Sequence, residues 1–242
     1  KRQAVSRFRE HGGIILGKTN TPEFGNSGVT TSPLNGLTVN PWDITRTTGG
    51  SSGGSVSAVA AGLGPLSVGT DAGGSIRTPA SFCGLVGLKP TFGRVPQAVG
   101  GDWGGISVSG PIARTVQDTA LAMNVMSLPD SRDWNALPTD SVDYLEETKR
   151  DIKGLTVAFS VDLGFMPVDS QVAEIVTNAA NHFSDLGANV VEATPDLGDP
   201  IDLFDLHWTP VIAHLSTTLT PAQRDLLGDE TKETIETAQQ FT

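Results

Sequence analysis

The sequence predicts an α/β fold, and two patterns support this prediction. In the second half of the chain, two short apolar segments, 155–159 and 189–192, flank an amphipathic stretch over 172–186. A strand, a helix and a strand joined by short links form a βαβ unit with parallel strands. In the first half, short apolar segments also alternate with helical ones, and 23 of the 28 glycines lie at or before Gly110. We therefore expect the glycine-rich half to carry the chemistry and the second half to act as scaffold.

The remaining elements are predicted from periodicity and from end signals. Helices are expected over 1–10, 55–61, 76–82, 115–126, 201–215 and 230–240, short strands over 14–16, 65–68 and 85–89, and an ordered surface loop over 26–40. Ser55 is expected to cap the second of these helices and Thr115 the fourth. Asp169 or Ser170 is expected to cap the amphipathic helix of the second half, which ends at Gly187.

Composition argues against several classes of function. The net charge of −11 lacks the basic excess of a nucleic-acid surface, so no direct contact with nucleic acid is expected. No apolar run approaches the roughly 18 residues that span a bilayer, so no membrane partner is expected. The single cysteine, Cys83, excludes an intrachain disulfide and fits a reducing, cytoplasmic location.

The four histidines give no sign of a metal site. They lie in separate sequence contexts, and no His/Cys cluster has the spacing of metal ligands. His207 lies close to Asp205, as in a hydrolase triad, but a histidine on a helix surface is the preferred interpretation. The sequence therefore predicts neither a metal nor a cofactor.

Two glycine- and serine-rich segments organise the first half, 49–55 (GGSSGGS) and 69–77 (GTDAGGSIR). A flexible linker would be glycine and serine throughout, whereas the residues between these segments are charge-poor and alanine-rich. A nucleophilic serine needs a tight turn, donors for an oxyanion and a base. The run 71–75 can supply the turn and the donors, because small residues let successive amides face one concavity. No histidine pairs with this loop, so a second serine backed by a neutral lysine would have to relay the proton.

These segments closely resemble the amidase signature family. The resemblance covers about 5–121 strongly and rests on several motifs in the right order: GKTNTPEF at 17–24, GGSSGGS at 49–55, GTDAGGSIR at 69–77, CGLVGLKPT at 83–91 and GPIAR at 110–114. It implies that family's α/β architecture, a mixed central sheet covered by helices on both sides, and no cofactor. It also implies one incomplete domain over 1–242, with a catalytic core at about 14–126 and a scaffold part at about 150–242.

The resemblance implies a Ser–cis-Ser–Lys triad. Ser75 would be the nucleophile, and Ser51 the bridging serine after a cis peptide from Gly50. Ser52 would support the hydrogen-bond network. The oxyanion hole would consist of the backbone N–H groups of Ala72, Gly73, Gly74 and Ser75. Asp71 and Arg77 would orient the loop, the alternative being a plain structural ion pair.

The triad's lysine is expected upstream of Lys1, so we expect a fragment that lacks this segment and the C-terminal part. Lys18 does not match its place in the family pattern, and Lys89 is expected to be structural. Cys83 is interpreted as a small buried hydrophobe rather than a nucleophile. These 242 residues alone are therefore expected not to hydrolyse amides at an enzymatic rate.

The function implied is hydrolysis of a small-molecule carboxamide to a carboxylate and ammonia or an amine, through an acyl-enzyme on Ser75. A homodimer is left open, and Trp103 and Ile106 are candidates for the pocket wall. One alternative is the A-type subunit of a glutamyl- or aspartyl-tRNA amidotransferase, from the same family. Thr78 stands where tRNA-linked members tend to carry glutamine, which favours a stand-alone amidase. The other alternative is a catalytically silent, truncated domain.

Overall fold

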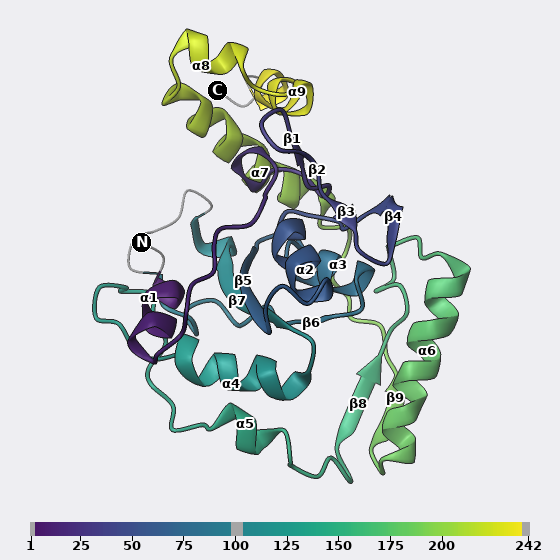
Figure 1. The fold of residues 1–242 in the computed structure, drawn as a ribbon. Helices are drawn as coiled ribbons and strands as arrows, with labels where there is room; N and C mark the ends of the chain where they lie inside the picture. Colours follow the sequence, from purple (N-terminus) through teal and green to yellow (C-terminus); the bar gives the residue numbers. More distant parts are fainter. Residues whose placement is uncertain (1–2, 98–103, 239–242) are drawn as a thin grey trace. The chain divides into compact units, whose positions relative to one another are not determined.

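The structure is a computed structural model, and it describes residues 3–97 and 104–238. The chain divides into two compact units, and Figure 1 labels the helices and strands of both. Unit 1 contains residues 1–148 and 208–242, and unit 2 contains residues 149–207. Residues 208–242 thus group with the glycine-rich half. The interpretation of all 242 residues as one incomplete domain stays a prediction.

Unit 1 is built around a three-stranded antiparallel sheet with the order β5-β7-β6. Its strands are β5 (Leu66–Asp71), β6 (Val86–Gly87) and β7 (Val108–Ala113). Every residue of β7 is buried, as expected of a central strand covered on both faces. Helix α2 (Gly53–Ala60) packs against β5 and β7, and α3 (Arg77–Phe82) packs against β6. Strand β5 ends at Asp71, directly before the loop that leads into α3.

Two small antiparallel hairpins precede α2. One pairs β1 (Thr31–Ser32) with β2 (Gly36–Leu37), and the other pairs β3 (Val39–Asn40) with β4 (Asp43–Thr47). The surface loop expected over 26–40 therefore contains three strands. Each is only two residues long, which is too short for a period-2 pattern to be recognised in the sequence.

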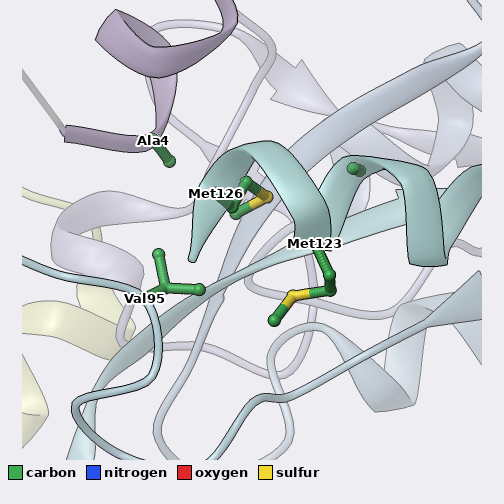
Figure 2. Packing of buried hydrophobic residues seen from close by; sticks show 5 residues of the cluster. Ala4, Val95, Met123 and Met126 are labelled. Atoms are coloured by element: carbon green, nitrogen blue, oxygen red, sulfur yellow. The ribbon is translucent and has the colours of Figure 1, made fainter. Parts of the chain in front are cut away.

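A second part of the unit 1 core lies around α4 (Val116–Met126). Met123 and Met126 are buried against Val95 and against Ala4 of α1 (Gln3–Glu10) (Figure 2). The Thr115 hydroxyl accepts a hydrogen bond from the Asp118 backbone N–H at 3.0 Å, so the predicted N-cap is confirmed. The short helix α5 (Tyr144–Glu147) packs against α4.

Two of the predicted local features are wrong. Residues 14–16 form no strand, and Ile14 and Leu16 are 85% and 75% exposed, because three apolar residues do not by themselves specify a buried strand. Helix α2 begins at Gly53 with Ser52 at the N-cap position, so Ser55 is not the cap. The Ser55 hydroxyl instead donates to the Val68 carbonyl oxygen at 3.1 Å and ties α2 to β5.

The C-terminal helices are α7 (Ile201–Thr217), α8 (Pro221–Asp225) and α9 (Asp229–Ala238). A short 3-10 turn, η1 (Glu23–Gly25), is tied to the start of α9, because the Glu23 Oε2 accepts from the Gly228 N–H at 2.9 Å and from the Thr231 hydroxyl at 2.8 Å. The Asn26 side chain donates to the Thr234 hydroxyl at 3.1 Å. The loop after the 17–24 motif is thus held by the last helix of the unit.

Unit 2 is the predicted βαβ unit. Strands β8 (Thr156–Phe159) and β9 (Asn189–Glu192) pair in parallel, and α6 (Ser170–Asp185) connects them. The Asp169 carboxylate caps α6, and Gly187 follows the helix with φ +86°. Helices and sheets both occur along the chain, so the α/β class is confirmed. Within the described ranges, no helix is long and apolar enough to cross a membrane.

Candidate active site

The first serine-rich segment forms a tight turn at the start of α2. Gly49 adopts φ +74°, and the peptide between Gly50 and Ser51 is cis, as predicted. Ser51 and Ser52 are both buried, with 5% and 4% of their surface exposed. The turn therefore holds two serine side chains inside the protein immediately ahead of the helix.

Side chains outside the motif hold this turn in place. The Thr30 hydroxyl donates to the Gly49 carbonyl oxygen at 2.9 Å and accepts from the Gly53 N–H at 3.2 Å. The Thr48 hydroxyl donates to the same Gly49 oxygen at 3.1 Å. The Gly54 N–H donates to the Asn20 carbonyl oxygen at 3.2 Å. Sequence reasoning missed the two threonines, because no periodic pattern links them to the turn.

The second loop, 71–77, is organised by the buried Asp71 carboxylate. This group accepts from the backbone N–H groups of Gly74, Ile76 and Arg77, at 2.8, 3.2 and 3.3 Å. It also accepts two hydrogen bonds from the Arg77 guanidinium, from Nε and Nη2, both at 2.9 Å. The Asp71 side chain is fully buried, whereas 54% of the Arg77 side chain is exposed. The carboxylate therefore fixes the course of the loop from inside.

The surroundings of Asp71 keep this carboxylate charged. Burial raises the pKa of the Asp71 carboxyl. The hydrogen bonds from Arg77 and from the Gly74 and Ile76 amides together lower it by more than burial raises it, so the pKa lies below its ordinary value. The hydrogen bonds to Asp71 raise the pKa of the Arg77 guanidinium. The predicted pair is thus present. Its backbone bonds favour the orienting role over a plain structural ion pair.

Ser52 joins the two loops. Its backbone N–H donates to the Ser75 carbonyl oxygen at 3.1 Å. Its hydroxyl accepts from the Thr70 N–H at 3.2 Å and donates to the Thr70 carbonyl oxygen at 3.3 Å. These bonds hold the Ser51 turn against the half-buried Ser75. They support the predicted role of Ser52 in the network.

The proton relay implied by the family resemblance would place the Ser51 hydroxyl within hydrogen-bond reach of Ser75. Both Ser51 and Ser75 belong to the described part of the chain, and no hydrogen bond joins their hydroxyls there. Catalytic hydrogen bonds are often long or poorly aligned before substrate binds and shorten in the substrate complex.

The amides of the second loop differ in their partners. The Gly74 N–H is occupied by Asp71 and therefore does not face an incoming oxygen. Within the described residues, the N–H groups of Ala72, Gly73 and Ser75 donate to no protein acceptor. Three of the four predicted oxyanion-hole amides are thus unoccupied.

Within the described part of unit 1, Lys18, Lys89 and Cys83 make no hydrogen bond to Ser51 or Ser75. Lys18 is exposed, and the Lys89 Nζ donates to the Pro90 carbonyl oxygen at 3.0 Å. Cys83 is fully buried in the cluster with Ile76, and burial raises the pKa of its thiol. His207 is exposed, with its Nδ1 against the Leu203 carbonyl oxygen, as predicted for a helix-surface histidine.

The described residues hold no group of three or more His, Cys, Asp or Glu side chains that is arranged to bind a metal ion. Of the two candidates for a pocket wall, Trp103 lies outside the described residues. Ile106 is half-buried in the 3-10 turn η2 (Gly104–Ile106).

A pocket of about 320 Å³ lies near the serine turn. It is lined by the loop 22–33 and by the start of α9: Pro22, Glu23, Asn26, Ser27, Thr31, Ser32, Pro33, Gly228, Asp229, Glu230 and Thr231. A methyl group added to the neighbouring Gly25 would lie 3.4 Å from the Ser51 Oγ. The pocket and the serine turn thus share the loop around Gly25.

The packing of Gly54 gives a stability prediction. A Cβ at this position would lie 2.5 Å from the Asn20 backbone nitrogen and 2.5 Å from its oxygen, so Gly54→Ala forces the two backbones apart. We expect a loss of about 1–3 kcal/mol in the free energy of unfolding, measured with urea, although alanine favours helix. Gly17→Ala is the control, because nothing lies within 4 Å of its Cβ. An unchanged or higher stability of Gly54→Ala contradicts the close approach.

The Amidase family model matches residues 2–238 of this chain. The acylamidase of Rhodococcus erythropolis is 45% identical over 211 residues, which make up 86% of this chain and 44% of that protein. The A-type subunit of glutamyl-tRNA(Gln) amidotransferase from Staphylococcus haemolyticus (strain JCSC1435) is 41% identical over 191 residues, 78% of this chain and 39% of that protein. The chain thus spans less than half the length of these relatives.

Solved structures give the same result. A bacterial aryl acylamidase of the amidase signature family matches with a TM-score of 0.89 and 30% identity, over 98% of this chain and 51% of that one. The 6-aminohexanoate cyclic dimer hydrolase complexed with substrate matches with a TM-score of 0.89 and 35% identity, over 99% of this chain and 53% of that one. The motifs, the fold and these matches agree, and the chain belongs to the amidase signature family.

Proposed function

We propose that the protein containing this chain is an amidase that hydrolyses a carboxamide to a carboxylate and ammonia or an amine. The observation that carries the proposal is the junction of the two loops. The Ser52 N–H holds the Ser75 carbonyl, so the turn that carries Ser51 lies beside a loop with unoccupied amides. This arrangement supports a serine nucleophile with a second serine and oxyanion donors beside it.

In the proposed reaction the Ser75 Oγ attacks the amide carbonyl carbon, and its proton passes to the Ser51 oxygen. The Ser51 proton passes in turn to a neutral lysine, which we place outside residues 1–242, and then to the leaving nitrogen. The negative oxygen of the tetrahedral intermediate accepts from the N–H groups of Ala72, Gly73 and Ser75, which donate to no acceptor among the described residues. Water then hydrolyses the Ser75 ester and releases the carboxylate.

Asp71 and Ser52 prepare this geometry without touching the substrate. Asp71 holds the amides of Gly74, Ile76 and Arg77, so the intervening chain turns in a fixed way. Preorganised donors stabilise a developing charge without having to reorient during the reaction. The Gly74 amide therefore has an orienting role in this proposal.

For the substrate we propose a small amide, cleaved in the cytoplasm without a cofactor and without direct contact with nucleic acid. The acylamidase relatives and Thr78 after Arg77 favour a stand-alone amidase. The second candidate is the A-type component of a glutamyl-tRNA(Gln) amidotransferase, which the 41% identity to that relative supports. The two candidates differ in whether they require partner subunits.

The test uses the full-length protein and a panel of N-acyl aryl amides, simple aliphatic amides and glutamine, with release of amine or ammonia as the readout. A stand-alone amidase is expected to release amine without partners. Turnover that is confined to glutamine and requires partner subunits would select the amidotransferase. Absence of turnover on every substrate, together with no labelling of Ser75 by a fluorophosphonate, would leave the catalytically silent domain.

A further inference from the structure

We propose that Thr30 is a positioning residue that sets the orientation of Ser51. The inference rests on the proposed function, because it concerns the bridging serine of that reaction. Thr30 lies outside the motifs that identify the family, in a region predicted only as a surface loop. The inference is carried by the contacts of one buried hydroxyl.

The Thr30 hydroxyl bonds to both ends of the serine turn. Thr30 is 1% exposed, and its Oγ1 donates to the Gly49 carbonyl oxygen at 2.9 Å. The same Oγ1 accepts from the Gly53 N–H at 3.2 Å. The residues between these two contacts are Gly50, Ser51 and Ser52. One side chain therefore bonds to both ends of the segment that carries the bridging serine.

The Thr30 side chain is held in place by its own backbone and by the start of α2. The Thr30 carbonyl oxygen accepts from the Thr38 N–H at 2.9 Å, which ties Thr30 to the adjacent hairpin. On the other side, a Cβ on Gly53 would overlap the Thr30 Oγ1, so α2 starts directly against the threonine. A buried side chain held in this way leaves the turn little room to shift.

Thr48 provides a matched comparison. It is also fully buried, and its hydroxyl donates to the same Gly49 oxygen at 3.1 Å. Its Oγ1 also lies close to Gly53, but its other hydrogen bond goes to the Thr38 carbonyl oxygen at 3.4 Å, and the Gly53 N–H donates to Thr30. Loss of the Thr48 hydroxyl therefore leaves both ends of the turn bonded to Thr30. Loss of the Thr30 hydroxyl removes the partner of the Gly53 N–H and leaves the Gly49 oxygen bonded to Thr48 alone.

The orientation of Ser51 matters because a proton relay depends on it. A displacement of about 1 Å can cost about 10²-fold in rate. We therefore expect Thr30→Val, which keeps the shape and removes the hydroxyl, to slow acylation of Ser75 by about 10- to 100-fold. The KM for the amide is expected to stay within about twofold, because Thr30 does not touch the substrate.

The experiment compares the full-length wild type with Thr30→Val, Thr30→Ser, Thr30→Ala and Thr48→Val. The readouts are the rate of fluorophosphonate labelling of Ser75, kcat and KM for one amide, and the midpoint of thermal unfolding. Thr30→Ser and Thr30→Ala both lack the methyl group and differ only in the hydroxyl. This pair tests the hydroxyl even if Thr30→Val does not fold.

The proposal requires slow acylation in Thr30→Val and Thr30→Ala, a near-normal rate in Thr30→Ser, and a smaller slowing in Thr48→Val than in Thr30→Val. It is overturned if Thr30→Ala and Thr30→Ser acylate at the same rate. It is also overturned if the rates of all variants, Thr48→Val included, merely follow their thermal stability. If wild-type Ser75 is neither labelled nor active, the proposed function itself fails, and the inference about Thr30 fails with it.

Discussion

Replacing Ser75 by alanine in the full-length protein is expected to abolish acyl-enzyme formation and to lower kcat by about four orders of magnitude or more. The attacking oxygen is removed, while the unoccupied amides and the pocket remain. Binding and oxyanion stabilisation alone leave only a small residual rate. Mass spectrometry after fluorophosphonate treatment should find the label on Ser75 in the wild type and no label in Ser75→Ala.

Ser55→Ala is the matched control for this prediction. Ser55 is a buried serine of the same glycine-rich region, but its hydroxyl bonds to the Val68 carbonyl oxygen and to the Thr19 hydroxyl. Its loss should lower stability by about 1 kcal/mol and leave labelling of Ser75 intact. Labelling at Ser51 or at Cys83 would reverse the assignment of the nucleophile. Cys83 is a poor candidate, because it is buried and its thiol pKa is raised.

The parts of the fold that could be predicted are those with local signals. Unit 2 has a capping aspartate, Asp169, a helix-ending glycine, Gly187, and two apolar strands at regular spacing. Thr115 likewise stands directly before the periodic helix that it caps. These features depend on residues only a few positions apart, so a local sequence pattern is enough to predict them. The exposed segment 14–16 shows the limit, since an apolar run alone does not specify a strand.

The site could be predicted from its motifs only as far as the identity of the loops. The contacts that fix the loops join distant positions, such as Thr30 with Gly49 and Gly53, or Asn20 with Gly54. A local sequence pattern cannot predict contacts between residues so far apart in the chain.

The amides of the second loop illustrate the same limit. In the sequence, Gly73 and Gly74 are equivalent candidates for an oxyanion hole. The Asp71 carboxylate distinguishes them, because it takes the N–H of Gly74 and leaves that of Gly73 without a protein acceptor.

The second large effect is expected from Asp71→Asn. An asparagine side chain presents N–H₂ donors where the carboxylate accepts from the Gly74 amide and from Arg77, so some of these bonds must break. We expect kcat to fall by about 10²- to 10³-fold, because the neighbouring oxyanion donors lose their fixed arrangement. The free energy of unfolding should fall by about 1–3 kcal/mol. This is below the 3–5 kcal/mol of a fully buried pair, because half of Arg77 stays solvated.

The same variant predicts a pH dependence. The pKa of Asp71 lies below its ordinary value of 3.8 in the folded protein, so the folded state binds this proton less readily than the unfolded chain. The stabilisation is therefore fully present above the unfolded-state pKa and is lost as the pH falls through the lower folded-state pKa. Urea unfolding at several pH values should show the difference between wild type and Asp71→Asn unchanged from pH 7 to about pH 5 and narrowing below about pH 4.

Asp130→Asn separates the loss of a charge from the loss of loop geometry. Asp130 pairs with Arg132 at 2.7 Å, and hydrogen bonds from Arg132 hold the pKa of Asp130 at about 2. This pair makes no contact with Asp71, so Asp130→Asn should lower stability at neutral pH and leave kcat unchanged. If Asp71→Asn also keeps the wild-type kcat, the carboxylate contributes only to stability. The three unoccupied amides would then owe their arrangement to Ser52 and to the sheet rather than to Asp71.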